Sequence, residues 1–289
     1  MGRMRTEQVC HYEAAGAEEI AEVLVTQPAA VLTGAGVSTD SGIPDYRSPG
    51  APKRKPMTWQ EFLGSEAAQR RYWSGAAKGW RRMREYEPNA GHLALAALER
   101  AGYVIGIATQ NVDSLHRRAG SQRVIELHGH LRTVHCLPQG HVETADSLLA
   151  RIRADNPWLD TQLVTEGPDG DAAIPDQLVD SFVLPRCLEC GGAMAPDVVM
   201  FGNFVSAENN RAVIDLMNTA DSLLAVGTSL VVNTGVKMVH RARRQGKPVM
   251  LVNRGATPVD ALAQFRVDGS TSAVLHRVAE LLGVAPARP

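Results

Sequence analysis

The sequence predicts an α/β fold, in which a doubly wound parallel sheet carries a second, smaller inserted part. Three observations predict this fold. Short apolar runs of strand length alternate with longer stretches of helical periodicity. Polar residues follow several of these runs, where the carboxyl end of a parallel strand would lie. Between about residues 132 and 195 the pattern breaks into short, turn-rich pieces that carry three of the four cysteines.

The composition is that of a globular protein and excludes two classes of partner. The 289 residues include 30 basic and 31 acidic side chains, so the chain lacks the basic surface of a nucleic-acid binder. No stretch reaches the roughly 18 uninterrupted apolar residues of a membrane span, and the N-terminus lacks the apolar core of a signal peptide. Four cysteines are too few for a disulfide scaffold in a chain of this length. We therefore expect a cytoplasmic protein whose partners include neither nucleic acid nor membrane, and the oligomeric state stays open.

The first predicted strand leads into the most distinctive stretch of the chain. A helix predicted over 16–26 precedes an apolar run, 29–32, which meets the glycine pair Gly34 and Gly36 and then residues rich in Ser, Thr and Asp. This order is typical of a strand, a tight turn and a helix N-terminus, where free N–H groups and the helix dipole favour a phosphate. A glycine pair alone is more often an ordinary strand-to-helix turn. The Ile-Pro-Asp-Tyr-Arg continuation, 43–47, adds an acid, an aromatic and a base directly beyond it.

The following segments predict a loop, a helical module and a second strand. Residues 48–56 carry three prolines and a basic cluster, which indicates a mobile loop, either a lid beside the phosphate site or a surface connector. Helical periodicity from 58 to 85 includes three of the four tryptophans. A helix over 93–100 then leads to a buried strand over 103–109, and polar residues follow that strand. Residues 124–129 contain a second apolar run with polar residues at its end.

Beyond the insert, the alternation of strand and helix resumes. The predicted pieces are an apolar run at 195–202, a helix near 207–219, a strand at 222–226, a helix near 235–245, a strand at 248–252, a closing helix at 272–282 and a disordered tail at 284–289. We expect one domain, 1–289, with three parts. They are a large doubly wound part formed by 16–49, 89–131 and 196–283, a helical module at 50–88 and a small cysteine-bearing insert at 132–195.

Read together, these motifs resemble the sirtuins, the bacterial-type NAD-dependent protein deacylases, and most of all their class II branch. The resemblance rests on motifs in the family's order over nearly the whole chain: Gly34-Ala35-Gly36-Val37-Ser38, Gly42 to Arg47, Thr109 to Asp113, His128-Gly129, Cys187-x-x-Cys190, Pro196 to Val199, Phe201-Gly202, Gly227 to Leu230 and Asn253. It implies a Rossmann-like large part, a zinc-ribbon-like insert and an enzyme that uses NAD.

The resemblance assigns cofactor contacts to two groups of residues. The phosphate, ribose and nicotinamide contacts would be Gly34, Ala35, Gly36, Ser38, Ile43, Asp45, Tyr46, Arg47, Gln110, Asn111 and Asp113. The adenosine-side contacts would be Gly227, Thr228, Ser229, Asn253 and Thr271. Amide side chains suit the nicotinamide carboxamide, and a carboxylate can stabilise positive charge that develops on the ribose. For Asn111 or Asp113 taken singly, helix capping is the simpler explanation.

The same resemblance assigns the chemistry. His128 corresponds to the family's catalytic base, a role that suits histidine because its ordinary pKa is about 6.5, and Asn111 and Asp113 complete the catalytic set. The implied substrates are acyl-lysine proteins or peptides. The implied reaction transfers the acyl group to ADP-ribose, releases nicotinamide and leaves free lysine. The peptide would add as a strand, and its contacts would include Val199, Phe201, Gly202 and Val231.

The insert departs from the family, whose two Cys-x-x-Cys pairs bind one structural zinc. The metal-ligating residues would be Cys136, Cys187 and Cys190. Gln139 stands where the fourth ligand is expected, so that ligand is missing there. His135 or His141 would be the substitute, although neither has the family's position. The alternative is a relict insert with free thiols, held together by packing.

Three other functions stay open at this point. Protein mono-ADP-ribosyl transfer uses the same fold, with a protein nucleophile capturing the ribose. An NAD-sensing binding module would not need His128, Asn111 and Asp113, all of which are present. A dehydrogenase is disfavoured because the third glycine of the dinucleotide fingerprint falls on Thr39.

Overall fold

The computed structural model describes residues 13, 16–46, 56–161, 172 and 174–284. Arg47, the predicted loop up to residue 55 and the tail from residue 285 lie outside the described residues. The chain forms two compact units. The first comprises Met1–Asp45, Glu87–Leu127 and Ser206–Pro289, and the second comprises Tyr46–Tyr86 and His128–Val205. Every helix in the described part of the chain is too short or too polar to span a bilayer.

The first unit contains the predicted parallel sheet. Its six strands run in the order β3-β2-β1-β7-β8-β9. Their bounds are β1 (Ala29–Thr33), β2 (Val104–Thr109), β3 (Val124–Glu126), β7 (Ser222–Val226), β8 (Val249–Val252) and β9 (Phe265–Val267). Strand β9 is an edge strand of three residues, too short to give a pattern in the sequence. The doubly wound α/β prediction is confirmed.

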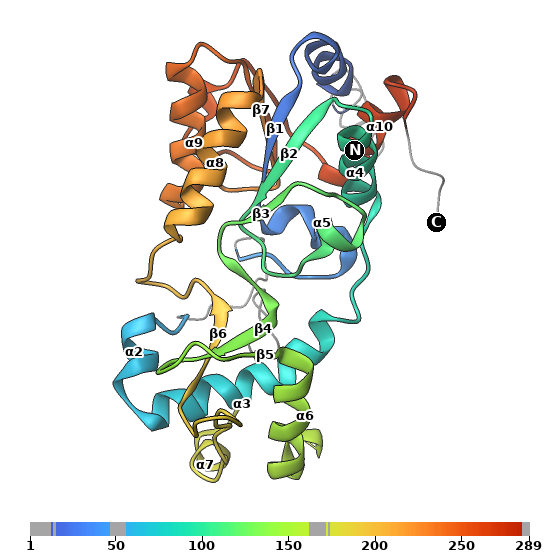
Figure 1. Ribbon diagram of the computed structural model, residues 1–289. Helices are drawn as coiled ribbons and strands as arrows, with labels where there is room; N and C mark the ends of the chain where they lie inside the picture. The colour runs from blue at the N-terminus through green and yellow to red at the C-terminus, as the bar shows by residue number, and fades with distance from the viewer. Residues whose placement is uncertain (1–12, 14–15, 47–55, 162–171, 173, 285–289) are drawn as a thin grey trace. The chain divides into compact units, whose positions relative to one another are not determined.

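Helices cover both faces of this sheet (Figure 1). Helical residues 16–26, α4 (Ala90–Arg100) and α10 (Thr271–Leu281) share one buried apolar cluster with alternate residues of the strands. Helices α8 (Ala207–Thr219) and α9 (Asn233–Arg244) pack on the other side. Every residue of β1 and β7 is buried, as expected for central strands covered on both faces.

The loops after β1 and β7 touch through their backbones. The amide of Gly36 donates to the carbonyl of Gly227 at 2.8 Å. A Cβ on Gly36 would lie 2.8 Å from that carbonyl oxygen, and a Cβ on Gly227 would lie 2.4 Å from the nitrogen of Val37. Gly227 also has a φ of +59°, which favours glycine. These glycines are therefore required by the contact between the two loops, whatever ligand lies beside them.

The helix N-terminus predicted after Gly36 is wrong. Two 3₁₀ turns follow β1 instead, η1 (Ala35–Val37) and η2 (Thr39–Ser41), each of three residues. The Thr39 hydroxyl bonds back to the Gly36 carbonyl at 3.1 Å, and Gly42 ends the second turn with a φ of +94°. Because turns this short sum few peptide dipoles, the predicted contribution of a helix dipole to phosphate binding is lost.

The second unit combines a three-stranded antiparallel sheet with helices. The strand order is β5-β4-β6, with β4 (Gly129–Cys136), β5 (Val142–Thr144) and β6 (Met194–Val198). The helices are α2 (Trp59–Gly64), α3 (Glu66–Met83), α6 (Ala145–Asp155) and α7 (Asp176–Val179), with the 3₁₀ helix η3 (Pro157–Thr161). The run at 195–202 begins in this small sheet and not in the parallel one, because Cys136 pairs with Met194 and Val134 with Pro196.

The helices of the tryptophan-rich stretch pack against the cysteine-bearing insert within this unit. Aromatic rings contact one another in series from Trp59 through Phe62, Tyr72 and Trp73 to Trp80, with neighbouring centroids 5.2–5.9 Å apart; the first pair is stacked and the other three meet edge to face. The Trp73 indole N–H donates to the Met194 carbonyl at 3.2 Å. The Trp73 bond therefore joins this aromatic series to a strand more than a hundred residues further along the chain.

We expect Gly227→Ala to destabilise the first unit more than a second glycine substitution with a similar φ. Gly246 has a φ of +69°, and a Cβ added there would have no heavy atom within 4 Å, so Gly246→Ala should lower the free energy of unfolding by about 1–2 kcal/mol through φ alone. Gly227→Ala adds a collision with the backbone of Val37, so its free energy of unfolding should fall clearly further. Urea denaturation of both variants measures the difference, and equal losses would contradict the loop contact as the reason for glycine.

Candidate functional site

Ser38 is the centre of a polar network at the carboxyl ends of β1 and β2. Its hydroxyl donates to Asp113 Oδ2 at 2.7 Å and accepts from Asn111 Nδ2 at 3.0 Å. Ser38 is 1% exposed and Asn111 is 8% exposed. The sequence motif containing Ser38 and the motif containing Asn111 and Asp113 are therefore in direct contact.

Local backbone bonds fix the two residues that follow β2. The Asn111 amide donates to Thr109 Oγ1 at 3.1 Å. Asp113 Oδ1 accepts the Leu115 amide at 2.9 Å, which closes an Asx turn at the start of α5 (Leu115–Arg118), whose N-cap residue is Ser114. The other carboxylate oxygen, Oδ2, accepts the Ser38 hydroxyl. Asp113 therefore fixes a local turn with one oxygen and takes part in the network with the other.

Burial raises the pKa of the Asp113 carboxyl above its ordinary value. Nearby Glu126 raises it further, while hydrogen bonds from the Leu115 amide, Ser38 and Asn111 act in the opposite direction. Glu126 is itself buried and is paired with Arg117 Nε at 3.3 Å. The ionised form of Asp113 thus depends on the donors that surround it.

Two buried histidines lie next to this network, and neither was among the predicted site residues. His92 is fully buried and His116 is 1% exposed, and their ring centroids lie 4.8 Å apart. His92 Nε2 lies 3.4 Å from Ser38 Oγ, and His116 Nε2 lies 2.9 Å from Thr33 Oγ1. Burial lowers the pKa of His116 to about 3, and burial followed by the charge of His116 lowers the pKa of His92 well below its ordinary value. Both rings are therefore neutral at physiological pH.

One sequence signal could have found His92. It stands three residues after Asn89, the spacing of a helix capping box, although the box usually has Glu or Gln at that position. Asn89 Oδ1 accepts the amides of Gly91 and His92, and the Asn89 amide donates to His92 Nδ1 at 3.3 Å. The capping box of α4 therefore holds the ring.

Most of the predicted cofactor residues gather in the first unit, around the loops after β1, β2 and β7. Thr228 Oγ1 donates to Gln110 Oε1 at 2.8 Å, Thr271 Oγ1 donates to the Gly36 carbonyl at 3.2 Å, and the Ile43 amide donates to the Ser38 carbonyl at 3.3 Å. The members of this group are Gly34, Ala35, Gly36, Ser38, Ile43, Gln110, Asn111, Asp113, Gly227, Thr228, Ser229 and Thr271. Asp45 follows Ile43 closely in the same unit, and Arg47 lies outside the described residues.

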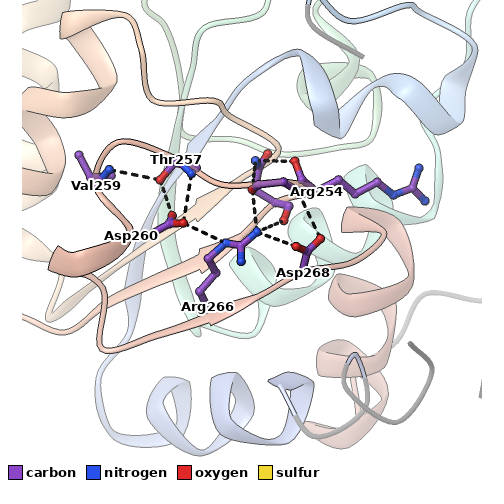
Figure 2. Close-up of polar contacts among 8 residues, drawn as sticks. Arg254, Thr257, Val259, Asp260, Arg266 and Asp268 are labelled. Atoms are coloured by element: carbon purple, nitrogen blue, oxygen red, sulfur yellow. Dashed lines mark hydrogen bonds and ion pairs between the residues drawn. The ribbon is translucent and has the colours of Figure 1, made fainter. Parts of the chain in front are cut away.

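Asn253 follows β8 in a loop that polar contacts brace (Figure 2). Its Nδ2 donates to the carbonyls of Arg254 and Gly255, at 2.9 and 3.2 Å. Arg266, on β9, holds the loop through the Gly255 carbonyl at 2.7 Å and through Asp268 at 2.8 Å. The Asn253 amide side chain is thus engaged with its own loop, and the Arg254 side chain points away from the cluster in Figure 2.

The second unit contains His128, Tyr46 and three of the predicted peptide contacts, Val199, Phe201 and Gly202. His128 lies in the turn before β4, and its carbonyl accepts the Val199 amide at 2.8 Å. Phe201 is 53% exposed, and its carbonyl accepts the Trp59 amide at 2.8 Å. Gly202 and Tyr46 are exposed.

Val231, also a predicted peptide contact, belongs to the first unit. It is 56% exposed and lies two residues before the start of α9 at Asn233.

A cluster of four metal-ligand side chains lies in the second unit. Cys136, His141, Cys187 and Cys190 each offer one ligand atom, and these atoms lie within 4.8 Å of one another. Cys136 Sγ is 3.3 Å from Cys190 Sγ, and His141 Nδ1 is 3.4 Å from Cys187 Sγ. Ligands about 2.3 Å from a tetrahedral zinc stand about 3.8 Å apart, so this set fits zinc.

The expectation that the fourth ligand is missing at Gln139 is therefore wrong. His141 completes the set from the residue just before β5, a position that spacing in the sequence does not reveal. His135, the other candidate, bonds instead to Asp197 Oδ1 through Nδ1 at 2.6 Å. His141 Nε2 lies 3.6 Å from a carboxylate oxygen of Glu189, the outer-shell partner that orients a ligating histidine.

The thiols differ in acidity. The contact with His141 lowers the pKa of Cys187 to about 6, whereas burial raises the pKa of Cys136 to about 11. A thiolate is the ligand form, so Cys187 is prepared for a metal and Cys136 needs the charge of the ion to lose its proton.

The chain is similar to proteins that are named NAD-dependent deacetylases or deacylases. The chain is 44% identical over 273 residues to NAD-dependent protein deacetylase 1 of Mycobacterium avium (strain 104), covering 93% of this chain and 96% of that protein. It is 44% identical over 241 residues to NAD-dependent protein deacylase SIR4 of Monosiga brevicollis, covering 82% and 78% respectively.

The fold comparison agrees. A solved Sir2 structure with a p53 peptide and NAD+ matches with a TM-score of 0.76 at 28% identity, over 92% of this chain and 98% of that one. The family model described as "Sir2 family" matches residues 34–234, which run from the first glycine of the turn after β1 into the first turn of α9. The chain belongs to the Sir2 family.

Proposed function

We propose that this protein is an NAD-dependent protein-lysine deacylase, which transfers the acyl group to ADP-ribose and releases nicotinamide. The observation that carries the proposal is the network of Ser38, Asn111 and Asp113 at the carboxyl ends of β1 and β2. Bound NAD would supply a ribose carbon that accepts the acyl oxygen of the substrate as nicotinamide leaves. Relatives that are 44% identical over most of the chain carry the name deacetylase or deacylase.

The residues of the first unit fit a dinucleotide. The chain reverses its direction of winding between β1 and β7, the position where open α/β sheets bind ligands. Gln110 and Asn111 offer amide groups for the nicotinamide carboxamide, and Asp113 offers a carboxylate for positive charge that develops in the transition state. We assign the adenosine end to Gly227, Thr228, Ser229, Asn253 and Thr271. The remaining cofactor contacts are assigned to Gly34, Ala35, Gly36, Ser38, Ile43, Asp45, Tyr46 and Arg47.

We assign the role of general base to His128. The turn that carries it is held tightly, because Gly129 has a φ of +77° and a Cβ there would lie 2.0 Å from the Asp197 carbonyl oxygen. The Val199 amide fixes the His128 carbonyl. A fixed turn keeps the backbone of the base in one place, which helps proton transfer at a defined hydroxyl.

The substrates would be acyl-lysine proteins or peptides. Val199, Phe201, Gly202 and Val231 are the proposed peptide contacts, and strand addition at these positions would read backbone more than sequence. The cytoplasmic location and the class II assignment remain predictions from the sequence.

We expect His128→Ala to lower kcat for deacylation by about 10²–10⁴-fold, because it removes the general base. The affinity for NAD should change little. The assay combines NAD with a panel of acyl-lysine peptides and follows O-acyl-ADP-ribose by mass spectrometry, while calorimetry follows NAD binding. His240→Ala, at an exposed histidine of α9, is the matched control and should keep full activity.

Undiminished turnover in His128→Ala would remove this residue from its role. If no peptide reacts while labelled NAD marks a protein target, protein ADP-ribosyl transfer replaces deacylation as the activity.

We also propose that Cys136, His141, Cys187 and Cys190 hold a structural zinc ion. A closed shell of three thiolates and one imidazole would link β4, the start of β5 and the Cys187–Cys190 turn. The ion would supply no chemistry to deacylation, since all four positions of a tetrahedral shell are filled by protein.

Metal analysis of protein purified without chelator should find about one zinc per chain. His141→Ala opens the shell and should lower the zinc content and the thermal midpoint together. His135→Ala is the control and should keep its zinc, because His135 bonds to Asp197. Loss of zinc in His135→Ala with retention in His141→Ala would contradict the assigned ligand set.

A further inference from the structure

We propose that His92 is a positioning residue for Asp113, which it reaches through the single proton of the Ser38 hydroxyl. The inference rests on the proposed function for the role of Asp113. It adds a residue from the helical cap of α4 that does not touch the reacting atoms. The contacts of His92 and Ser38 determine which atom donates in each hydrogen bond of the network.

The cap of α4 determines the tautomer of His92. The Asn89 amide carries a proton and donates it to His92 Nδ1 at 3.3 Å, so Nδ1 is the bare nitrogen. The ring is neutral, because it is fully buried and packs against the second buried imidazole of His116. A neutral ring with a bare Nδ1 carries its proton on Nε2.

The Nε2 proton then directs the Ser38 hydroxyl. Nε2–H points at Ser38 Oγ across 3.4 Å, and Asn111 Nδ2–H donates to the same oxygen at 3.0 Å. With two donors on its lone pairs, Ser38 has only Asp113 Oδ2, at 2.7 Å, as the acceptor for its own proton. In the other tautomer, the bare Nε2 would compete with Asp113 for that proton.

The consequence falls on the Asp113 carboxylate. Its ionised form is disfavoured by burial and by Glu126, and it is stabilised by the Leu115 amide, Ser38 and Asn111. The other titratable groups around it are His92, the neutral His116 of α5 and Arg117, which pairs with Glu126. Losing the directed Ser38 donor therefore moves Asp113 toward its protonated form, in which it cannot stabilise positive charge.

Two substitutions at His92 separate positioning from stability. His92→Gln keeps the acceptor for the Asn89 amide and the donor to Ser38. The glutamine oxygen can accept the amide, as in an ordinary capping box, and its nitrogen can donate to Ser38. His92→Leu keeps a side chain of similar size but removes both the acceptor and the donor. Leu98→Ala, at a fully buried position of the same helix, is the control for lost stability and should lower the thermal midpoint.

We expect His92→Leu to lower kcat by about tenfold or more with the KM for NAD nearly unchanged, since the lost interaction acts in the transition state. The acidic limb of its kcat profile should move to higher pH. His92→Gln should restore most of the rate, and Leu98→Ala should keep the wild-type rate below its melting temperature. Unchanged kcat in His92→Leu, or a Gln variant no better than Leu, would overturn the inference.

A measurement without NAD tests the hydrogen-bond directions themselves. Ring-nitrogen NMR of histidine-labelled protein should show His92, assigned by its absence from His92→Gln, as a neutral Nε2–H tautomer from about pH 5 to about pH 9. An Nδ1–H tautomer, or a ring that titrates in this range, would overturn the proposal. A wild-type chain with no NAD-dependent turnover would instead remove the proposed function, and the role of Asp113 with it.

Discussion

Backbone contact between the loops after β1 and β7 is the constraint on which the first unit depends. The parallel sheet winds outward in both directions from this pair of strands, so the two loops leave the sheet side by side. They lie so close that a Cβ on Gly36 or Gly227 would collide with backbone. This contact sets the position of Ser38, two residues beyond Gly36, and Thr271 of α10 bonds to the same Gly36 carbonyl. The glycines predicted to contact phosphate are thus also required by backbone packing, and packing alone is sufficient to explain them.

Around Ser38, bonds that stabilise local backbone structure also organise a polar network. Asp113 closes an Asx turn at the start of α5, and Asn89 and His92 form the capping box of α4. Each leaves one polar atom within hydrogen-bond distance of the Ser38 hydroxyl. A cap has a defined geometry, because it satisfies backbone N–H groups that would otherwise lack a partner. The network is therefore fixed by local backbone bonds at the starts of α5 and α4. Its electrostatics follow from burial, which keeps both histidines neutral and makes the ionised Asp113 depend on its donors.

The metal-ligand cluster shows how a ligand can change its place in the chain without leaving the site. Gln139 occupies the position of the expected cysteine, but the chain turns back within two residues and brings His141 Nδ1 to 3.4 Å from Cys187. Antiparallel pairing of β4 with β5 and with β6 creates this approach, since it places the ends of the three strands together. Glu189, between the two cysteines of the second pair, lies beside the other ring nitrogen.

The sequence by itself determined the parts that depend on local pattern. The helix at 207–219 and the strand at 222–226 were predicted to the residue, and the motifs of Ser38, Asn111 and Asp113 identified the family because each is a short contiguous stretch. Tertiary structure alone decided the rest: that Met194–Val198 joins the small sheet, that β9 exists, that His141 replaces a cysteine and that His92 meets Ser38. The physical reason is that periodicity and capping act over a few neighbouring residues. Strand partners, metal shells and buried hydrogen bonds join residues that are tens to more than a hundred positions apart, and only the folded backbone brings those residues together.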